Sequence, residues 1–330
     1  MSILLTGGAG YIGSHMAGYL LKNNFEFIVF DNLSTSSLEN LEKLEKKYNK
    51  KINFVNGDLR EIKDIQNVFG NFYIHSVIHF AGLKSVEESL LKPDHYYDNN
   101  VLGSQNLMNV SSSNKVRNFI FSSSACIYGE PNSLPIKENH PFNPFSVYGL
   151  NKVAVEELLI NDSFFKSECN TVILRYFNPI GSFYDNTIGE SSLGKVSNLM
   201  PNIIKVLRKE SSHLKIYGSD YDTPDGTAIR DFIHILDLIE SHLKSFDLPN
   251  DGIKIFNVGT GIGYTVLSVL QTFNKVNKVE LPYKFYPRRP GDISSCFSSV
   301  NKISSVLGWT ASRNLESMCR DSYLFSIINE

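Results

Sequence analysis

Short apolar runs alternate with amphipathic stretches through the first half of the chain. The runs are rich in Ile, Val and Phe and carry few polar residues, which is typical of strands that are covered on both faces of a sheet. We therefore predict strands at Ser2–Thr6, Phe27–Phe30, Ile52–Val55, Ser76–Phe80, Asn118–Phe121 and Thr171–Tyr176, and helices near 11–23, 37–48, 61–69, 93–114 and 149–166. Strand–helix alternation of this kind predicts a doubly wound parallel sheet.

The alternation ends after Tyr176. Residues 178–198 are rich in Asn, Ser and Gly, and the rest of the chain mixes short patterns: a helix near 199–209, a helix at Asp237–Ser245 and a strand at Ile255–Val258. A length of 330 residues is enough for two domains. We predict a Rossmann-type α/β domain over 1–176, to which parts of 231–258 return, and a smaller mixed α/β domain over 177–330 that binds the substrate.

Composition and net charge limit the kinds of partner that the protein is expected to bind. The apolar share is 42%, the charged share is 20% and the net charge is −2, so neither a nucleic acid nor an anionic membrane is favoured as a partner. No apolar run approaches the ~18 residues of a membrane span. The four cysteines, Cys126, Cys169, Cys296 and Cys319, lack the spacing of a metal site. Because the chain opens on a predicted strand rather than a basic leader, we expect a cytoplasmic protein with reduced thiols.

A glycine-rich segment lies between the first predicted strand and the first predicted helix. Gly7 permits a tight turn, Gly10 lets the backbone approach a pyrophosphate, and Gly13 allows close packing of helix on strand. The following helix start favours phosphate through its N–H groups and its dipole. Asp31 ends the second strand, where an acid accepts hydrogen bonds from ribose hydroxyls and repels a 2′-phosphate. The pattern predicts NAD binding rather than NADP binding.

A YxxxK motif opens the helix predicted at 149–166. Four-residue spacing places Tyr148 and Lys152 on one helix face. We expect the lysine charge to lower the pKa of the tyrosine towards neutrality, which would make the phenol a general acid or base. Ser124 closes a serine run at the end of the fifth strand, where its hydroxyl can share a substrate oxygen with the tyrosine. The sequence therefore predicts catalysis by Tyr148, Lys152 and Ser124.

These motifs stand in a longer series: LLTGGAGYIGSH, DNLS, GDLR, VIHFAGLKSV, YYDNNV, NFIFSSSACIYGE, YGLNK, LRYFNPIG, NLMP, DGTAIRDFIH and YPRRPGD. In this order they resemble the extended short-chain dehydrogenase/reductase family, and within it the nucleotide-sugar 4-epimerases, over essentially the whole chain. The resemblance implies reversible 4-epimerisation of UDP-glucose and UDP-galactose through a 4-keto sugar, with transient hydride transfer to bound NAD.

The resemblance also implies roles for individual residues. Tyr148, Lys152 and Ser124 match the family's catalytic groups. Matches to cofactor contacts are Tyr11, Ile12, Asp31, Asn32, Asp58, Leu59, Phe80, Ala81, Lys84, Asn99 and Phe177. Matches to UDP-sugar contacts are Asn178, Asn198, Leu199, Tyr217, Arg230, Arg289 and Asp292. Arginine suits a diphosphate because its planar fork donates hydrogen bonds in pairs. The segment Ser182–Thr187 departs from the family pattern near the expected sugar site.

Two further features follow from the resemblance. Cys296 matches a position beside the sugar's 2-substituent, where a residue smaller than tyrosine leaves room for an N-acetyl group. We therefore expect UDP-N-acetylglucosamine and UDP-N-acetylgalactosamine as additional substrates. The helices near 93–114 and 149–166 match a pair that forms a four-helix bundle with a second subunit, so we expect a homodimer. The apolar residues available for its seam are Val101, Leu102, Leu107, Val110, Val153, Val155, Leu158 and Leu159, although part of this set must face the sheet instead.

Other functions fit the motifs less well. A nucleotide-sugar 4,6-dehydratase needs an Asp-Glu pair where this chain has Ala125 and Cys126, so dehydration is disfavoured. A 4-epimerase of UDP-glucuronate or UDP-xylose differs in the shape of its pocket and stays an alternative. A non-catalytic NAD-sensing protein also stays an alternative, although such proteins usually lose the tyrosine or the lysine.

Overall fold

The computed structural model describes residues 2–190, 198–289 and 291–328. The chain forms two compact units, and each is made of segments that are distant in sequence. The first unit contains the residues up to Tyr128, Phe142–Arg175 and Ile239–Phe256; the second contains Gly129–Pro141, Tyr176–Leu238 and the residues from Asn257 onward.

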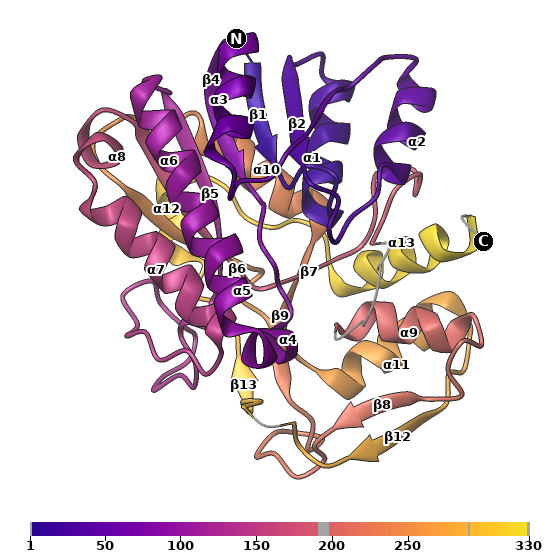
Figure 1. Cartoon of the computed structure of the whole chain (residues 1–330). Coiled ribbons are helices and arrows are strands. Elements are labelled where there is room, and N and C mark those ends of the chain that lie inside the picture. Colours follow the sequence, from indigo (N-terminus) through magenta and orange to yellow (C-terminus); the bar gives the residue numbers. More distant parts are fainter. Residues whose placement is uncertain (1, 191–197, 290, 329–330) are drawn as a thin grey trace. The chain divides into compact units, whose positions relative to one another are not determined.

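A seven-stranded sheet forms the first unit's centre (Figure 1). Its strands are β1 (Ser2–Thr6), β2 (Phe27–Asp31), β3 (Asn53–Asn56), β4 (Ile74–His79), β5 (Asn118–Ser124), β6 (Asn170–Tyr176) and β10 (Lys254–Val258), in the order β10-β6-β5-β4-β1-β2-β3. The pairings β1–β2, β2–β3, β1–β4 and β4–β5 are parallel. The predicted Rossmann-type doubly wound sheet is confirmed. The strand order reverses between β1 and β4, where ligands of such sheets bind at the carboxyl ends of the strands.

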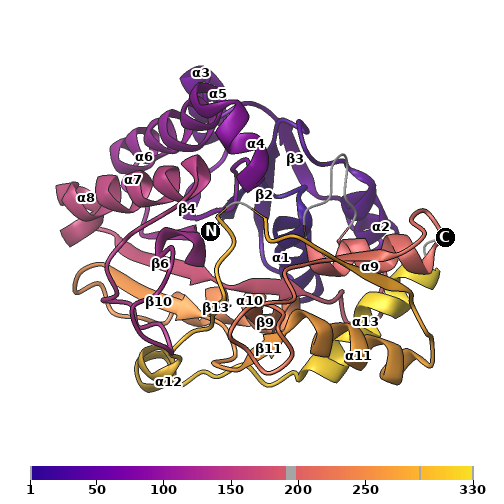
Figure 2. The same cartoon turned by 90° about the horizontal axis from the view of Figure 1, so that it is seen from below.

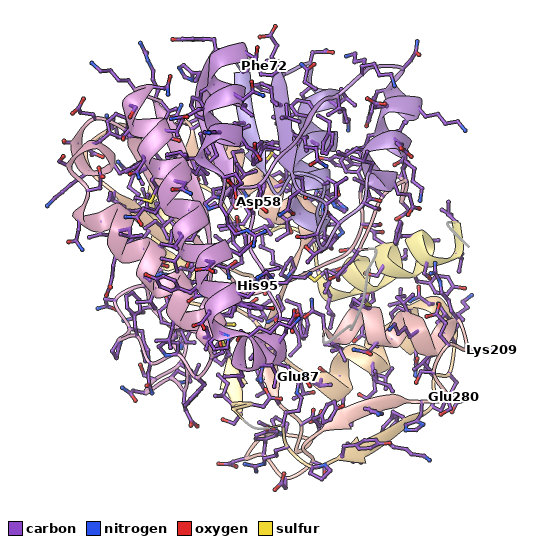
Figure 3. All side chains as sticks on the ribbon, in the orientation of Figure 1. Asp58, Phe72, Glu87, His95, Lys209 and Glu280 are labelled. Atoms are coloured by element: carbon purple, nitrogen blue, oxygen red, sulfur yellow. The ribbon has the colours of Figure 1, made fainter. Side chains whose placement is uncertain are left out.

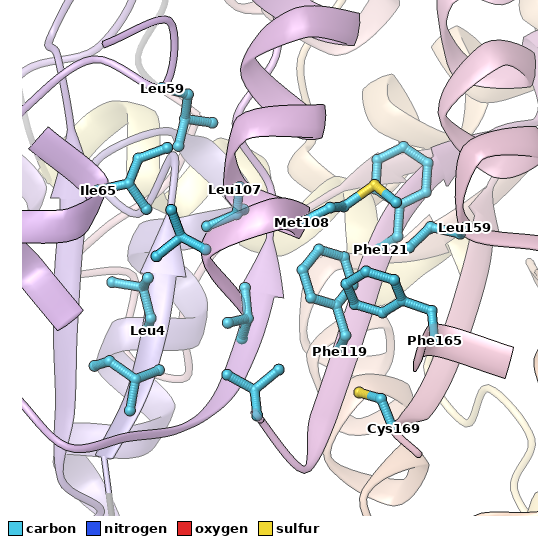
Figure 4. Packing of buried hydrophobic residues seen from close by; sticks show 14 of the residues in the cluster. Leu4, Leu59, Ile65, Leu107, Met108, Phe119, Phe121, Leu159, Phe165 and Cys169 are labelled. Carbon is cyan, nitrogen blue, oxygen red and sulfur yellow. The ribbon is translucent and has the colours of Figure 1, made fainter. Parts of the chain in front are cut away.

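Helices cover both faces of this sheet (Figure 2). On one face lie α3 (Ile62–Asn71), α6 (Gly103–Ser113) and α7 (Val147–Asn161), and on the other α1 (Tyr11–Lys22) and α2 (Glu39–Tyr48). The core under the first three helices joins apolar side chains of strands and helices, among them Leu4, Leu107, Phe119, Leu159 and Phe165 (Figure 4). Alternating strand residues thus reach opposite layers, which explains why these strands are apolar throughout.

Several details differ from the sequence prediction. The strand β3 is not buried on both faces, because it lies at the edge of the sheet and its residues are exposed or half-buried. The helix predicted near 93–114 is α5 (Pro93–Tyr97), the π-helical segment η1 (Asp98–Leu102) and α6, and the stretch near 149–166 is α7 followed by α8 (Ser163–Ser167). The helix α4 (Val86–Leu91) was not predicted; Ser85 caps it by accepting the N–H of Glu88.

The second unit is built around β9 (Ile229–His234). This strand pairs in parallel with β7 (Asn178–Ile180) and β13 (Ser295–Cys296), and antiparallel with β11 (Gly263–Thr265). A separate parallel pair joins β8 (Leu214–Tyr217) to β12 (Tyr283–Tyr286). The helices of this unit are α9 (Leu199–Leu207), α11 (Val266–Asn277), α12 (Asn301–Leu307) and α13 (Leu315–Ile328), whereas most of α10 (Ile235–Ser245) belongs to the first unit. Side chains from α9, α11 and α13 share one apolar core.

None of the helices in the described part of the chain combines the length and the apolarity that a membrane crossing requires. Over the same residues, no group of three His, Cys, Asp or Glu side chains could hold a metal ion.

Candidate active site

The turn after β1 has no room for side chains at two of its glycines. Gly7 has a φ of +69°, and a Cβ there would lie 2.5 Å from the backbone nitrogen of Ala81. At Gly13 a Cβ would lie 2.3 Å from the carbonyl oxygen of Gly7. A Cβ at Gly10, the N-cap of α1, would meet its nearest atom at 3.3 Å. Because glycine at the N-cap has no side chain to accept the first N–H groups, this helix start suits a phosphate.

Asp31, at the end of β2, stabilises this turn by hydrogen bonds. Its carboxylate is buried and accepts hydrogen bonds from the N–H of Ala9 at 3.0 Å, the N–H of Leu33 at 2.9 Å and the hydroxyl of Ser36 at 3.0 Å. Sequence reasoning assigned Asp31 only a ligand role, and these bonds add a structural one. A carboxylate at this position would repel the 2′-phosphate of NADP, so it would favour the binding of NAD.

Most of the other predicted cofactor residues follow neighbouring strands of the first unit. Asp58, labelled in Figure 3, follows β3 and accepts hydrogen bonds from Asn32 at 3.0 Å and from Arg60 at 2.6 Å. The Arg60 guanidinium holds the pKa of the Asp58 carboxyl well below its usual range. Phe80 and Ala81 follow β4, and Asn99 lies in η1, where it donates to Asn100 at 3.0 Å. The cofactor residues that lie in the first unit are Gly7, Gly10, Tyr11, Ile12, Gly13, Asp31, Asn32, Asp58, Leu59, Phe80, Ala81, Lys84 and Asn99, whereas Phe177 lies in the second unit.

The predicted catalytic groups lie together at the end of β5 and the start of α7. Ser146 caps this helix by accepting the N–H of Gly149 at 3.0 Å. One turn apart on α7, Tyr148 and Lys152 face β5, and the Lys152 Nζ lies 5.8 Å from the centre of the Tyr148 ring. Lys152 is buried and donates to the carbonyl oxygen of Ser122 at 2.7 Å. The structure therefore brings Tyr148, Lys152 and Ser124 to one place.

The expected lowering of the Tyr148 pKa is wrong for this structure. Burial raises the pKa of the Tyr148 phenol, the Cys126 thiol beside it acts in the same direction, and a hydrogen bond from Ser124 acts in the opposite direction. Burial also lowers the pKa of Lys152 to about 8, and the carboxylate of Glu156 opposes that fall. The physical reason is desolvation, because removing either group from water penalises its charged form. A neutral phenol beside a readily titrated ammonium is thus the state that the chain itself favours.

Sequence reasoning missed two charged residues behind this pair. Glu156 lies one turn after Lys152 on α7, and Arg175 lies on β6; both are buried and they form an ion pair at 2.6 Å. The repeated four-residue spacing of Tyr148, Lys152 and Glu156 was a signal for the carboxylate. The arginine carries no such signal, because its link to α7 exists only in the folded chain.

A separate charged group lies in the second unit. The carboxylate of Asp292 accepts from Arg230 at 2.5 Å and from Arg289 at 2.9 and 3.1 Å. The Arg289 guanidinium lies 5.1 Å from the centre of the Tyr217 ring. Arg230 lies on β9 and Tyr217 ends β8, so two different sheets contribute. Four of the predicted UDP-sugar residues are therefore neighbours, with two guanidinium groups converging on one carboxylate.

The other predicted sugar-nucleotide residues lie elsewhere in the same unit. Asn178 on β7 donates to the carbonyl oxygen of Asp231 at 2.9 Å, and Asn198 and Leu199 begin α9. Cys296 on β13 is buried and lies opposite Arg230 in the strand register. Sequence reasoning missed Asp231, whose buried carboxylate accepts hydrogen bonds from backbone and side-chain donors of Thr260, Gly261 and Ser298. It joins the strand that carries Arg230 to the segment that follows Cys296.

Comparison with known families decides the affiliation. A model described as "NAD dependent epimerase/dehydratase family" matches residues 3–259, which is more than half of the chain. The chain belongs to the NAD dependent epimerase/dehydratase family. A protein of Pasteurella multocida (strain Pm70) named UDP-glucose 4-epimerase is 44% identical over 329 residues, which cover 98% of this chain and 96% of that protein.

Solved structures of this family are similar over the full length. The UDP-glucose 4-epimerase of Bifidobacterium longum in complex with NAD+ and UDP has a TM-score of 0.95 and 39% identity, with 100% of this chain and 99% of that chain covered. The UDP-Glc/GlcNAc 4-epimerase of Campylobacter jejuni has a TM-score of 0.84 and 36% identity, with 99% of each chain covered.

Proposed function

We propose that this chain is a UDP-glucose 4-epimerase that interconverts UDP-glucose and UDP-galactose with NAD bound throughout the cycle. The observation that carries the proposal is the position of Tyr148 and Lys152 on one face of α7, beside Ser124 at the end of β5. The same function is named for relatives that match the whole chain. We infer a role in galactose metabolism and nucleotide-sugar supply.

Each catalytic residue has a role that its surroundings support. Tyr148, as the phenolate, takes the proton of the sugar's 4-hydroxyl and becomes a phenol, and Ser124 donates a hydrogen bond to the same sugar oxygen. Lys152 stays protonated and stabilises the phenolate before this transfer. NAD, when bound, would supply an acceptor for the hydride of carbon 4, and its positive nicotinamide ring would add to the charge that favours the phenolate. Since burial alone raises the pKa of Tyr148, both positive charges are needed for the proton transfer.

The residues of the first unit fit NAD. Gly7 and Gly13 keep side chains out of the turn, and Gly10 leaves the start of α1 to a phosphate. Asp31 places a carboxylate where the adenine ribose of such cofactors lies. We propose cofactor contacts for the whole group predicted from the sequence, Phe177 included. NAD ends each cycle unchanged, so we expect the purified protein to retain it.

The residues of the second unit fit a uridine diphosphate group. We propose that Arg230 and Arg289 bind the diphosphate, that Tyr217 lies beside the uracil, and that Asp292 binds the uridine ribose. Asn178, Asn198 and Leu199 complete the nucleotide-sugar contacts. In the structure, the Asp292 carboxylate accepts hydrogen bonds from both guanidinium groups. A bound diphosphate would replace the carboxylate as the acceptor of these hydrogen bonds. Strong contacts to the nucleotide and few to the sugar suit a reaction in which the keto sugar must turn over.

A direct assay tests this function. The purified protein is incubated without added NAD with UDP-galactose, UDP-N-acetylgalactosamine, UDP-xylose and UDP-glucuronate, and the products are resolved by chromatography. We expect UDP-glucose from UDP-galactose, and NAD rather than NADP in the supernatant of the denatured protein. Turnover of UDP-xylose or UDP-glucuronate alone would support the alternative epimerases. Bound NAD without turnover of any sugar would support an NAD-sensing protein.

We further propose that the enzyme accepts the N-acetylated sugars. Cys296 is small and buried, and it lies opposite Arg230 in the register of β13 and β9. A related structure that matches 99% of this chain is a UDP-Glc/GlcNAc 4-epimerase. The smaller side chain would leave space for an N-acetyl group at carbon 2.

We propose a homodimer as well, with a seam formed by those of the eight apolar residues that do not face the sheet. Most of the predicted seam residues are buried within the first unit's own core, namely Val101, Leu107, Val110, Val155 and Leu159. Leu102, Val153 and Leu158 remain at least partly exposed. Beside them is a groove of about 560 Å³, lined by Tyr97, Val101, Gln105, Ala154, Glu157, Leu158, Asn161 and Asp162. We also propose a cytoplasmic location, since Cys169 and Cys319 are reduced thiols.

A further inference from the structure

The end of β5 and one face of α7 are joined by three successive links. The Ser124 hydroxyl contacts the Tyr148 phenol, the Ser122 carbonyl oxygen accepts from Lys152 at 2.7 Å, and the Ser123 hydroxyl donates to Glu156 at 2.5 Å. Their helix partners are spaced by four residues, so each link is one turn below the last. The first two partners are the proposed catalytic pair, and the third has no role in the reaction as proposed above.

The third link, from Ser123 to Glu156, is stabilised by further hydrogen bonds to the same carboxylate. The Glu156 carboxylate has no exposed surface and also accepts three bonds from Arg175, at 3.0 and 3.2 Å through Nε and at 2.6 Å through Nη2. The same guanidinium donates to the Tyr128 hydroxyl at 2.8 Å and lies 5.0 Å from the centre of the Phe142 ring. Three secondary-structure elements, β5, α7 and β6, therefore meet at one buried carboxylate. An ion pair that is shielded from water keeps its geometry, because separating its partners would leave a buried charge without a counter-charge.

We propose that Glu156, fixed by Ser123 and Arg175, is a positioning residue that holds α7 in register with β5 and supplies the negative charge that keeps Lys152 an ammonium. The inference rests on the proposed function of Tyr148 and Lys152. It adds a residue that touches neither the proposed substrate nor the proposed cofactor. Its effect passes through Lys152, one helical turn away.

The surroundings of Lys152 show why such a charge matters. Burial lowers the pKa of Lys152 to about 8, whereas Glu156 and the Cys126 thiol act to raise it. The other titratable groups near the pair are Tyr148, Arg175, Tyr128 and His79. His79 is buried between the hydroxyls of Thr6 and Ser104 and stays neutral, because burial and the Lys152 charge lower its pKa to about 3. Glu156 is thus the nearby carboxylate that favours the ammonium.

The test compares three variants with the wild-type holoenzyme. Glu156→Gln keeps the size and the bond to Ser123 but removes the charge. The double variant Glu156→Gln/Arg175→Met removes both charges, which protects against misfolding because apolar replacement of a buried pair is often well tolerated. Ser123→Ala removes only the contact to β5. Asp237→Asn is the matched control, since its fully buried carboxylate in the second unit also holds an arginine, Arg313.

Two readouts separate positioning from mere stability. The first is the pH profile of kcat with UDP-galactose. Without the Glu156 charge, Lys152 loses its proton at lower pH, so we expect the alkaline limb to move about 1 unit or more towards acid in both Glu156 variants. We also expect kcat to fall about 10- to 100-fold with little change in KM, because the catalytic pair is misplaced. Ser123→Ala should lower kcat without moving the limb, and Asp237→Asn should lower stability alone.

The second readout does not depend on turnover. Carbon-13 NMR of protein with labelled lysine Cε, with the signal assigned through Lys152→Met, gives the titration of Lys152 directly. An unchanged Lys152 titration and an unchanged alkaline limb in both folded Glu156 variants would overturn the inference. If the wild-type protein turns over no UDP-sugar, the proposed function fails, while the NMR titration still decides the role of Glu156.

Discussion

Two carboxylates in this molecule each join two groups, but in different surroundings. In the first unit, Glu156 is fully buried and its partners Ser123 and Arg175 are buried with it. In the second unit, Asp292 joins Arg230 and Arg289; the side chains of Asp292 and Arg230 are 12% and 17% exposed, and that of Arg289 is 47% exposed. Water can replace Arg289, one partner of the second carboxylate, at lower cost, whereas the partners of the first have no replacement. The fully buried set around Glu156 is therefore suited to hold a fixed geometry, and the partly exposed set around Asp292 is suited to exchange a carboxylate for the phosphates of a ligand.

The two units also differ in how their proposed functional groups act, through perturbed pKa values in the first unit and through hydrogen bonds in the second. Burial in the first unit moves the pKa values of Tyr148 and Lys152 in the directions that disfavour charge. Such perturbed groups are typical of catalysis. In the second unit, the guanidinium groups of Arg230 and Arg289 act by donating hydrogen bonds to Asp292. Variants of the first unit should therefore change turnover and its pH dependence, and variants of the second should change binding.

Replacement of the proposed base is the strongest test of this division. Tyr148→Phe removes the phenolic oxygen that is proposed to take the sugar's proton, and general acid–base catalysis is typically worth about 100- to 10,000-fold. We expect kcat to fall by that factor or more while UDP binding, measured by calorimetry, stays near the wild-type value. Near-normal turnover would place the base elsewhere, and a large loss of UDP affinity would break the division between the units.

The second prediction concerns the cost of burying Lys152. Its pKa is about 8 in the folded protein and about 10.4 in an unfolded chain, a difference of about 2.4 units or about 3 kcal/mol. Lys152→Met removes a charge that is costly to bury and also the bond to Ser122. We expect the variant to lose turnover and yet gain about 1–3 kcal/mol in the free energy of unfolding at pH 7, measured with urea.

The sign of the pH dependence sharpens this test. A lysine with a lowered folded pKa binds fewer protons in the folded state than in the unfolded state between pH 8 and about 10. Wild-type stability from this group therefore rises with pH over that window. The advantage of Lys152→Met should shrink between pH 8 and 10. A constant advantage would mean that packing at this position, and not the buried charge, sets the difference.

The same contrast explains what the sequence could reveal. The glycine turn, Asp31 and the Tyr148–Lys152 pair were found because each lies within one local pattern of strand, turn or helix. The ion pair of Glu156 and Arg175 was missed because its partners lie on α7 and β6 and meet only after folding. The direction of the Tyr148 pKa was missed for the same reason, since burial is a property of the folded chain.

Element length limited the prediction of the second unit. Its strands β7, β11 and β13 contain three, three and two residues, which is too short for an alternating pattern to appear. Arg230, Arg289 and Asp292 were therefore found only through the family resemblance. The buried carboxylate of Asp231, which joins β9 to two loops, was not found at all.

The third prediction tests the partly exposed set around Asp292. Arg289→Leu removes one of the two guanidinium groups proposed to bind the diphosphate, and a hydrogen bond to a charged group is worth about 1.5–3 kcal/mol. We expect KM for UDP-galactose to rise about 10- to 150-fold with little change in kcat. Arg288→Leu is the matched control, since its guanidinium pairs with Asp220 and lies over Tyr221. An equal effect of the two variants would mean that general positive charge, not the Asp292 cluster, attracts the ligand.

The last prediction concerns space rather than charge in the second unit. Cys296 is buried, and the proposed function places it beside carbon 2 of the sugar. Tyrosine is larger by most of an aromatic ring, and overpacking of a filled site costs about 1–3 kcal/mol. Cys296→Tyr should therefore lower kcat/KM for UDP-N-acetylgalactosamine about 5- to 150-fold relative to UDP-galactose, since about 1.4 kcal/mol corresponds to a tenfold change. Competition assays with both sugars in one mixture measure this ratio directly.

Cys319→Ala is the control, because that thiol is buried in the core of the same unit and should leave the ratio unchanged. If the wild type turns over UDP-galactose but not UDP-N-acetylgalactosamine, Cys296 does not open the site, and the divergent segment Ser182–Thr187 becomes the next position to exchange.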